Sequence, residues 1–209
     1  MLAIKHGNRT LVLVLHEIYG INDHMELAAA SFAEQGFDVL VPDLIDRNPP
    51  FSYDQSERAY RNFVDAVGFD PAFEQVKKLL AEEAKDYDEI HIVGFSVGAT
   101  VAWLCSQSNH IASVTAFYGS RIRDYREITP LCPVLLIYGE REKSFNVTDF
   151  IAEVADGSIE AVSLPGEHGF ADPFAPVFDK NSRQKALDLM KNFQKTHSTI
   201  SNRTVILPP

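Results

Sequence analysis

The stretch Gly94-Phe95-Ser96-Val97-Gly98 follows an apolar run, Ile90-His91-Ile92-Val93, and precedes small residues that begin at Ala99. This order is typical of a strand, a tight turn and a helix, with strained backbone geometry at the apex of the turn. The flanking glycines remove side chains that would collide there. The apex hydroxyl would project clear of the sheet at a helix amino end, where developing negative charge is stabilised. The pattern predicts a nucleophile elbow with Ser96 at its apex, and the alternative is an ordinary glycine-rich turn.

Short β-branched runs alternate with amphipathic stretches along the chain, and this alternation predicts a doubly wound, mostly parallel sheet. The predicted strands are Leu11–Leu15, Asp38–Val41, Glu89–Val93, Ser113–Phe117, Val134–Tyr138 and Ile159–Leu164. The predicted helices are Asp23–Gln35, Pro71–Lys85, Val97–Gln107, Val147–Ala155 and Ser182–Thr196. With the elbow, this predicts a single α/β-hydrolase domain over residues 1–209, with about six or seven strands and helices on both faces.

Two segments fall outside this alternation. The long connection of residues 45–69 is predicted to contain a short helix from Gln55, and it forms either a lid or pocket wall, or a surface loop with an extra helix. Asp70 is predicted to cap the helix that follows. The tail, residues 198–209, is either an edge strand through Thr204–Leu207 or disordered.

Composition narrows the classes of partner. The chain has 209 residues, 19 Lys and Arg against 29 Asp and Glu, and a formal net charge of −10. With no basic cluster, nucleic acid and anionic membranes are poor partners. The early apolar run Leu11–Leu15 is too short to span a membrane, and the start lacks the pattern of a cleavable signal. Cys105 and Cys132 form neither a disulfide framework nor a CxxC pair. We therefore expect a cytoplasmic protein with a small-molecule or protein partner, and no bound metal.

A serine nucleophile needs a base, and in α/β hydrolases the chain order is serine, acid, histidine. His168 lies in Gly166-Glu167-His168-Gly169-Phe170, just after the last predicted strand. His110 comes too early in the chain, and His197 lies in a polar tail. His168 is therefore the predicted base, and the alternative is an ordinary loop histidine.

The acid should follow the preceding strand, in Leu136-Ile137-Tyr138-Gly139-Glu140-Arg141-Glu142. Glu142 stands three residues after the glycine, which is the usual acid position. A glutamate can hold the imidazole tautomer and stabilise imidazolium as an aspartate does. Glu142 is the predicted acid, with Glu140 and Asp149 as alternatives.

An oxyanion hole needs two backbone N–H groups. One is expected from Val97, the residue after the nucleophile. The other is expected from the loop after the first central strand, His16-Glu17-Ile18-Tyr19-Gly20-Ile21-Asn22.

Three motifs resemble the dienelactone hydrolase family of α/β hydrolases. They are Glu17-Ile18-Tyr19-Gly20, Val41-Pro42-Asp43-Leu44 and His168-Gly169-Phe170, and the resemblance runs from about Leu11 to Phe193. The resemblance implies that Ile18 supplies the second oxyanion N–H and that Glu17 lies beside the nucleophile in the pocket. We also expect Glu17, Tyr19 and Tyr60 to contact the substrate.

The chain departs from the family pattern at functional positions. The enzymes that act on dienelactone carry cysteine at the elbow and aspartate as the acid, where this chain has Ser96 and Glu142. They place an arginine four residues after the histidine, where this chain has Asp172, which would repel an anion. Arg58 or Arg61 is a candidate replacement.

The family's first strands are also reduced here, because only ten residues precede Leu11. The expected activity is hydrolysis of small carboxylic esters or lactones through an acyl-enzyme, without a metal or organic cofactor. The dienelactone substrate itself is not expected to carry over. The alternative is a non-catalytic binding protein of the same fold that has lost turnover.

Overall fold

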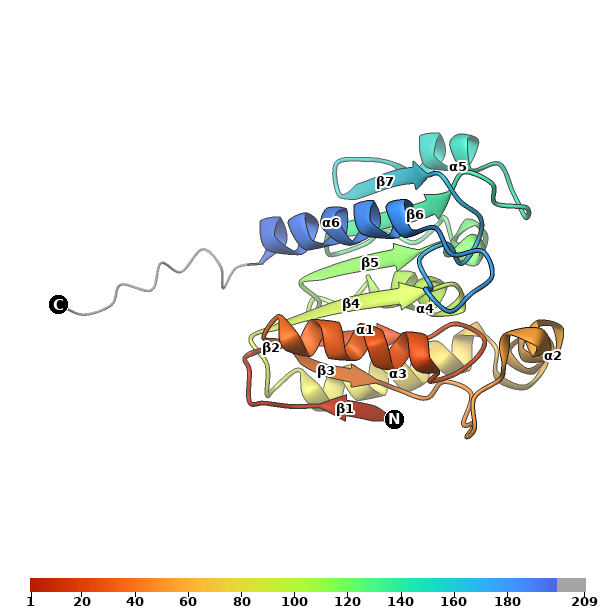
Figure 1. Cartoon of the computed structure of the whole chain (residues 1–209). Coiled ribbons are helices and arrows are strands. Elements are labelled where there is room, and N and C mark those ends of the chain that lie inside the picture. Colours follow the sequence, from red (N-terminus) through yellow and green to blue (C-terminus); the bar gives the residue numbers. More distant parts are fainter. Residues whose placement is uncertain (199–209) are drawn as a thin grey trace.

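The computed structural model describes residues 1–198, which form a seven-stranded sheet with helices on both faces (Figure 1). The strands are β1 (Leu2–Ile4), β2 (Thr10–Leu15), β3 (Asp38–Val41), β4 (Glu89–Phe95), β5 (Ser113–Phe117), β6 (Val134–Gly139) and β7 (Ile159–Leu164). They lie in the order β1-β3-β2-β4-β5-β6-β7. Every neighbouring pair is parallel except β1 and β3. The predicted fold class is confirmed.

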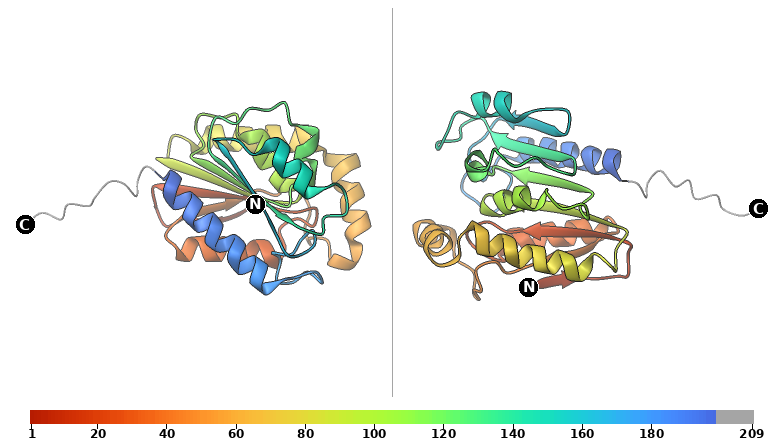
Figure 2. Two further views of the ribbon diagram at one scale, coloured as in Figure 1. Left: turned by 90° about the horizontal axis from the view of Figure 1, so that it is seen from above. Right: turned by 180° about the vertical axis from the view of Figure 1, so that it is seen from behind.

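The helices divide between the two faces of the sheet (Figure 2). They are α1 (Asp23–Glu34), α2 (Ser56–Arg61), α3 (Phe69–Glu83), α4 (Val97–Cys105), α5 (Val147–Val154) and α6 (Lys180–His197). Three short helical turns join them: η1 (Tyr53–Gln55), η2 (Asn62–Val67) and η3 (Ser120–Asp124). Helices α1 and α6 cover one face, and α3, α4 and α5 cover the other. Among residues 1–198, no helix combines the length and the apolar character that a bilayer crossing requires.

The inner strand β2 shows why an apolar run becomes a central strand. Side chains alternate across a strand, so Leu11 and Leu13 pack toward α3 and α4, while Val12 and Val14 pack toward α1 and α6. Both faces are covered, and all four side chains are at most 1% exposed. Burial of each stabilises the fold by about 1.5–3 kcal/mol, which favours an unbroken apolar run over an alternating one.

Two details differ from the sequence predictions. The first ten residues contain strand β1, which pairs antiparallel with β3 at the sheet edge. Asp70 does not cap α3, because that helix begins one residue earlier at Phe69 and has Gly68 in the capping position. Gly68 adopts a φ of 79°, so the chain reverses directly from η2 into α3. The short helix predicted from Gln55 is confirmed as α2, whereas the predicted strand at Thr204–Leu207 lies outside the described residues.

The connections leave a crevice at one end of the sheet. The chain runs from β2 outward to β3 and then returns to β4 on the other side of β2. Strands β2 and β4 end side by side, with Leu15 paired to Gly94. In open α/β sheets, ligands bind outside the carboxyl ends of the strands at such a switch point. Helix α2 lies at this end of the sheet (Figure 1).

Candidate active site

The elbow lies between β4 and α4 and holds Ser96 in a strained conformation. Its φ of 53° and ψ of −112° are unusual for any residue other than glycine. Its N–H donates to the Phe117 carbonyl at 2.9 Å, which ties the turn to β5. A Cβ on Gly98 would lie 2.3 Å from the Leu15 carbonyl oxygen, and one on Gly94 would lie 2.3 Å from the Gly98 carbonyl oxygen. Glycine at both positions lets α4 start against the backbone of β2.

Ser96 begins a chain of two hydrogen bonds. Its Oγ lies 2.9 Å from Nε2 of His168, and Nδ1 of that histidine lies 2.8 Å from Oε2 of Glu142. Ser96 follows β4, Glu142 follows β6 and His168 follows β7, so the ends of three strands at the same edge of the sheet supply the three side chains. Within residues 1–198, neither Glu140 nor Asp149 bonds to His168. The structure therefore brings Glu142, of the three carboxylates considered, to the histidine.

The surroundings of Glu142 favour its ionised form. Burial alone would raise the pKa of this carboxyl group. The hydrogen bond and charge of His168, with a bond from Ser144 Oγ at 3.2 Å, outweigh burial and hold the pKa below its ordinary value. An ionised Glu142 can only accept at its oxygens, so it fixes the proton of His168 on Nδ1. The lone pair of Nε2 then faces the Ser96 hydroxyl, as a base requires.

Two backbone N–H groups are available beside Ser96. Val97 is the first residue of α4, and the first N–H groups of a helix have no partner within it. Ile18 lies in the loop between β2 and α1, and its N–H has no hydrogen-bond partner within residues 1–198. Both residues line the same cavity as Ser96 and His168. An oxyanion hole requires this pairing of donors next to the nucleophile.

The cavity over Ser96 has a volume of about 740 Å³, which is within the range of small-molecule sites. It is lined by Ile18, Ser56, Glu57, Tyr60, Val64, Gly68, Phe69, Ser96, Val97, Thr100, Ser120, Arg121, Arg123, Asp124, Glu142, Ser144 and His168. The segment predicted as a lid or pocket wall thus contributes one wall.

The residues of this segment that line the cavity are spaced as on one face of a helix. Glu57, Tyr60 and Val64 are three and four residues apart and line the cavity. Arg58 and Arg61 are absent from the lining. The guanidinium carbon of Arg58 lies 5.9 Å from the centroid of the Phe51 ring, and Arg61 forms an ion pair with Glu57. The expectation that one of these arginines reaches the substrate is therefore not met, because the cavity faces other positions of the helix.

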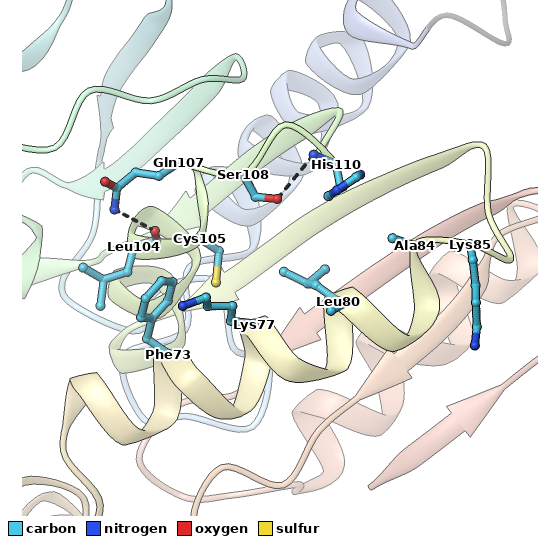
Figure 3. A pocket seen from close by; sticks show the side chains of 11 residues that line it. Phe73, Lys77, Leu80, Ala84, Lys85, Leu104, Cys105, Gln107, Ser108 and His110 are labelled. Atoms are coloured by element: carbon cyan, nitrogen blue, oxygen red, sulfur yellow. Dashed lines mark hydrogen bonds between the residues drawn. The ribbon is translucent and has the colours of Figure 1, made fainter.

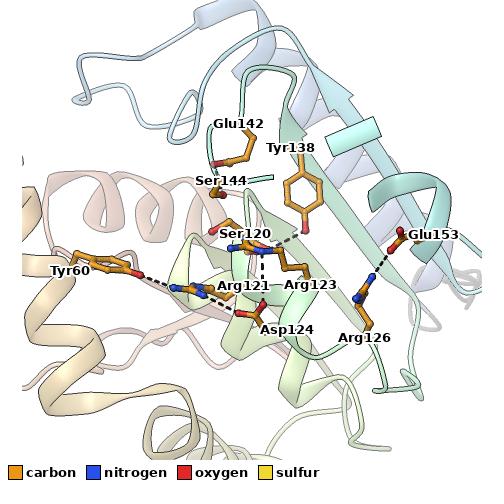
Figure 4. Close-up of polar contacts among 11 residues, drawn as sticks. Tyr60, Ser120, Arg121, Arg123, Asp124, Arg126, Tyr138, Glu142, Ser144 and Glu153 are labelled. Carbon is orange, nitrogen blue, oxygen red and sulfur yellow. Dashed lines mark hydrogen bonds and ion pairs between the residues drawn. The ribbon is translucent and has the colours of Figure 1, made fainter. Parts of the chain in front are cut away.

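The cations at this site come from a segment that the sequence analysis did not select. Ser120, Arg121, Arg123 and Asp124 lie on η3 and line the cavity (Figure 4). Arg121 donates to the Tyr60 hydroxyl at 2.9 Å and to Asp124 at 3.1 Å. The sequence feature that could have indicated these residues is their position, because η3 comes shortly after the carboxyl end of the predicted strand Ser113–Phe117.

Glu17 and Tyr19, predicted to contact substrate, are not among the residues that line the cavity. Glu17 is 7% exposed and accepts a hydrogen bond from the Tyr118 hydroxyl at 2.8 Å. Tyr19 packs edge-on against Tyr53, with ring centroids 4.9 Å apart. Asp172, expected to repel a substrate anion, is also fully buried and accepts from the Tyr53 hydroxyl at 2.5 Å. Neither Glu17 nor Asp172 is among the residues that line the cavity, so neither contacts a bound substrate directly there.

These buried carboxylates belong to the potential metal-ligating group within residues 1–198. Ligand atoms of Glu17, His24 and Asp172 all lie within 4.8 Å of one another. Nδ1 of His24 lies 3.7 Å from Asp172 and has no hydrogen-bond partner among residues 1–198. Glu17, however, already accepts a hydrogen bond from the Tyr118 hydroxyl, and Asp172 accepts one from the Tyr53 hydroxyl. These donors offset part of the negative charge of the two carboxylates.

Glu17 gives the fold a pH dependence. Burial, followed by the charge of Asp172, raises its pKa from an ordinary value of 4.5 to about 7. Between these values the folded protein binds more protons than the unfolded chain, so stability falls as pH rises through that window. We expect the wild type to lose about 2–3 kcal/mol between pH 5 and 8 relative to Glu17→Gln. Urea unfolding of both proteins at the two pH values measures this, and parallel profiles would contradict it.

A second large cavity lies between α3 and α4 (Figure 3). Its volume is about 810 Å³. It is lined by Phe73, Lys77, Leu80, Ala81, Ala84, Lys85, Leu104, Cys105, Gln107, Ser108 and His110. Burial raises the pKa of the Cys105 thiol, which keeps it protonated and unreactive. The hydrogen-bonded side chains of Ser96, His168 and Glu142 all lie at the other cavity.

The parallel sheet, the elbow and its contacts with a histidine and a carboxylate define an α/β hydrolase. The sequence matches the profile of the dienelactone hydrolase family over residues 1–198. The chain therefore belongs to the dienelactone hydrolase family, as the resemblance predicted, and it is a hydrolase of ester bonds.

Individual relatives agree with this placement. The chain is 33% identical to the uncharacterized protein YczH of Bacillus subtilis (strain 168) over 187 residues, which are 88% of this chain and 92% of that protein. It is 28% identical to a carboxymethylenebutenolidase of Rhodococcus opacus over 54% of this chain and 44% of that enzyme. A dienelactone hydrolase-like promiscuous phosphotriesterase from metagenomic libraries shares the fold, with a TM-score of 0.70, 19% identity, and coverage of 92% of this chain and 88% of that chain.

Proposed function

We propose that the protein is a serine hydrolase that cleaves small carboxylic esters or lactones through an acyl-enzyme. The observation that carries the proposal is the hydrogen-bonded chain from Ser96 through His168 to Glu142. It ends in a cavity next to the N–H groups of Ile18 and Val97. A nucleophile, a base, an orienting acid and an oxyanion hole are the parts that acyl transfer needs.

The acylation step uses these groups in order. Nε2 of His168 takes the hydroxyl proton as Ser96 Oγ bonds to the substrate carbonyl carbon. The carbonyl oxygen becomes an oxyanion that the N–H groups of Ile18 and Val97 stabilise. The tetrahedral intermediate then expels the alcohol oxygen, which takes the proton from His168. In a lactone this alcohol stays attached to the acyl group.

Deacylation repeats the sequence with water. His168 takes a proton from water, the hydroxide bonds to the acyl carbon, and collapse of the intermediate returns the proton to Ser96. Glu142 keeps its charge throughout and stabilises the imidazolium that forms in each half-reaction. An ester yields an acid and an alcohol, whereas a lactone yields one hydroxy acid.

Cavity and relatives support small esters and lactones as the substrate class. A volume of about 740 Å³ accommodates a small molecule. The Rhodococcus relative is named for a butenolide, which is a lactone. The alternative, a binding protein without turnover, would tolerate Glu142 out of reach of His168, and their 2.8 Å contact therefore favours catalysis.

The proposed compartment is the cytoplasm. Cys105 and Cys132 are free and buried. Free thiols are usual in reducing compartments, where disulfides are rare.

A fluorophosphonate probe tests the function, because only an activated serine is labelled. The intact protein is expected to be labelled at Ser96 and to hydrolyse p-nitrophenyl acetate and a small lactone. Ser120→Ala is the matched control, since Ser120 lines the same cavity but lies outside the His168 hydrogen bonds. Labelling should persist in this control and disappear after heat denaturation. Absence of both labelling and turnover in the folded wild type would refute the proposal.

A further inference from the structure

His16 connects the loop after β2 with the loop after β3. Its ring is fully buried. Nδ1 lies 2.5 Å from the carbonyl oxygen of Glu17, and Nε2 lies 2.9 Å from the backbone nitrogen of Leu44. The ring therefore bonds to the loop that carries Ile18, and it is not itself among the residues that line the cavity.

The two contacts allow one tautomer. The Leu44 N–H can only donate, so Nε2 must present a lone pair. The ring proton then sits on Nδ1 and is donated to the Glu17 carbonyl. Burial lowers the pKa of His16, which keeps the ring neutral. The Asp43 carboxylate, 3.9 Å from Nε2, is too distant to accept a hydrogen bond from it.

The carbonyl that His16 holds belongs to the peptide group that carries the Ile18 N–H. A trans peptide is planar, so its N–H points opposite to its C=O. A donor that fixes the direction of the Glu17 carbonyl also fixes the direction of the Ile18 N–H. The Gly20 N–H donates to the same carbonyl at a longer 3.4 Å, so His16 makes the shorter contact.

We propose that His16 is a positioning residue for the oxyanion hole, holding the Glu17–Ile18 peptide so that the Ile18 N–H faces the substrate carbonyl. This role rests on the proposed serine mechanism. The oxyanion forms only in the tetrahedral state, so loss of the role lowers kcat and leaves KM nearly unchanged. Loss of one oxyanion donor costs about 10²–10³-fold, and a misplacement of 1 Å can cost about 10²-fold.

Three variants separate positioning from packing. His16→Leu fills the buried position with an apolar side chain and removes both hydrogen bonds. We expect kcat to fall about 10²-fold. His16→Asn places an amide N–H near the position of Nδ1, and it should recover kcat to within about tenfold of the wild type. His91→Leu is the matched control, because His91 is buried at the amino end of β4 and bonds to Ser113. It should keep the wild-type kcat.

Kinetics with p-nitrophenyl acetate, unfolding temperatures and the affinity of an aryl trifluoromethyl ketone complete the test. The ketone forms an oxyanion on Ser96, so its affinity should fall in parallel with kcat in His16→Leu. Long-range proton–nitrogen NMR of the wild type should show the Nδ1–H tautomer at His16. This spectrum and the asparagine variant decide the question if His16→Leu does not fold.

The outcomes separate the two proposals. An Nε2–H tautomer, an unchanged kcat in folded His16→Leu, or an asparagine variant as impaired as leucine would each overturn the role of His16. In those cases the wild type still turns over substrate, and the serine mechanism stands. If the wild type shows no turnover that depends on Ser96, the mechanism fails and the role of His16 fails with it.

Discussion

Replacement of Ser96 by alanine is expected to lower kcat/KM for p-nitrophenyl acetate by at least about 10³-fold. The change removes the hydroxyl oxygen that lies 2.9 Å from Nε2 of His168, which is the atom that would bond to the substrate carbonyl carbon. Fluorophosphonate labelling should be lost together with turnover. Activity retained in the purified, folded variant would exclude Ser96 as the nucleophile.

Glycine at the same position separates catalysis from strain. Alanine keeps a Cβ, so it keeps the cost of a φ of 53°, which is about 1–3 kcal/mol at such sites. Glycine adopts positive φ freely but makes the unfolded chain more flexible, which offsets part of the gain. We expect Ser96→Gly to be as inactive as Ser96→Ala and at least as stable in urea unfolding. A glycine variant clearly less stable than the alanine variant would contradict the strain at the elbow.

The sequence predicted those parts of the site whose chemistry is local. The elbow is readable because Gly94 and Gly98 occupy positions where a Cβ would lie 2.3 Å from backbone oxygen. Glu142 and His168 each follow a recognisable strand and come in the usual chain order of acid and then histidine. Their positions at the strand ends therefore predicted that the two side chains would lie close together. The fold was equally readable, because strands covered on both faces require unbroken apolar runs.

The parts that the sequence did not predict depend on the direction in which a side chain points once the helices and loops have packed. Arg58 and Arg61 share a short helix with Tyr60, and only the packed structure shows that Tyr60 faces the cavity. Arg121 enters the site through a helical turn whose position no periodicity indicates. Asp172 follows the histidine as a substrate-binding residue would, yet its loop turns it inward to the Tyr53 hydroxyl. Spacing along the chain locates such residues near the site but does not fix where they point.

Glu142→Gln is expected to lower kcat by about 10³–10⁴-fold with little change in KM. The side chain keeps its length and loses its charge, so the imidazolium that forms during each step loses its partner. The tautomer also changes. Ser144 donates to one carboxylate oxygen, which favours an amide whose oxygen faces Ser144 and whose NH2 faces His168. Nδ1 must then accept, and the proton moves to Nε2, where it blocks removal of the Ser96 proton.

Glu140→Gln is the matched control for this variant. Glu140 lies two residues away, is exposed and makes no bond to His168 within the described chain, so the same charge change there should alter kcat less than about twofold. Steady-state kinetics at neutral pH distinguishes the two variants, and nitrogen NMR of His168 reports the tautomer directly. If Glu142→Gln keeps kcat within tenfold of the wild type, Glu142 is not the acid. Asp149→Asn would be the next variant, because Asp149, in the first turn of α5, is the remaining carboxylate considered.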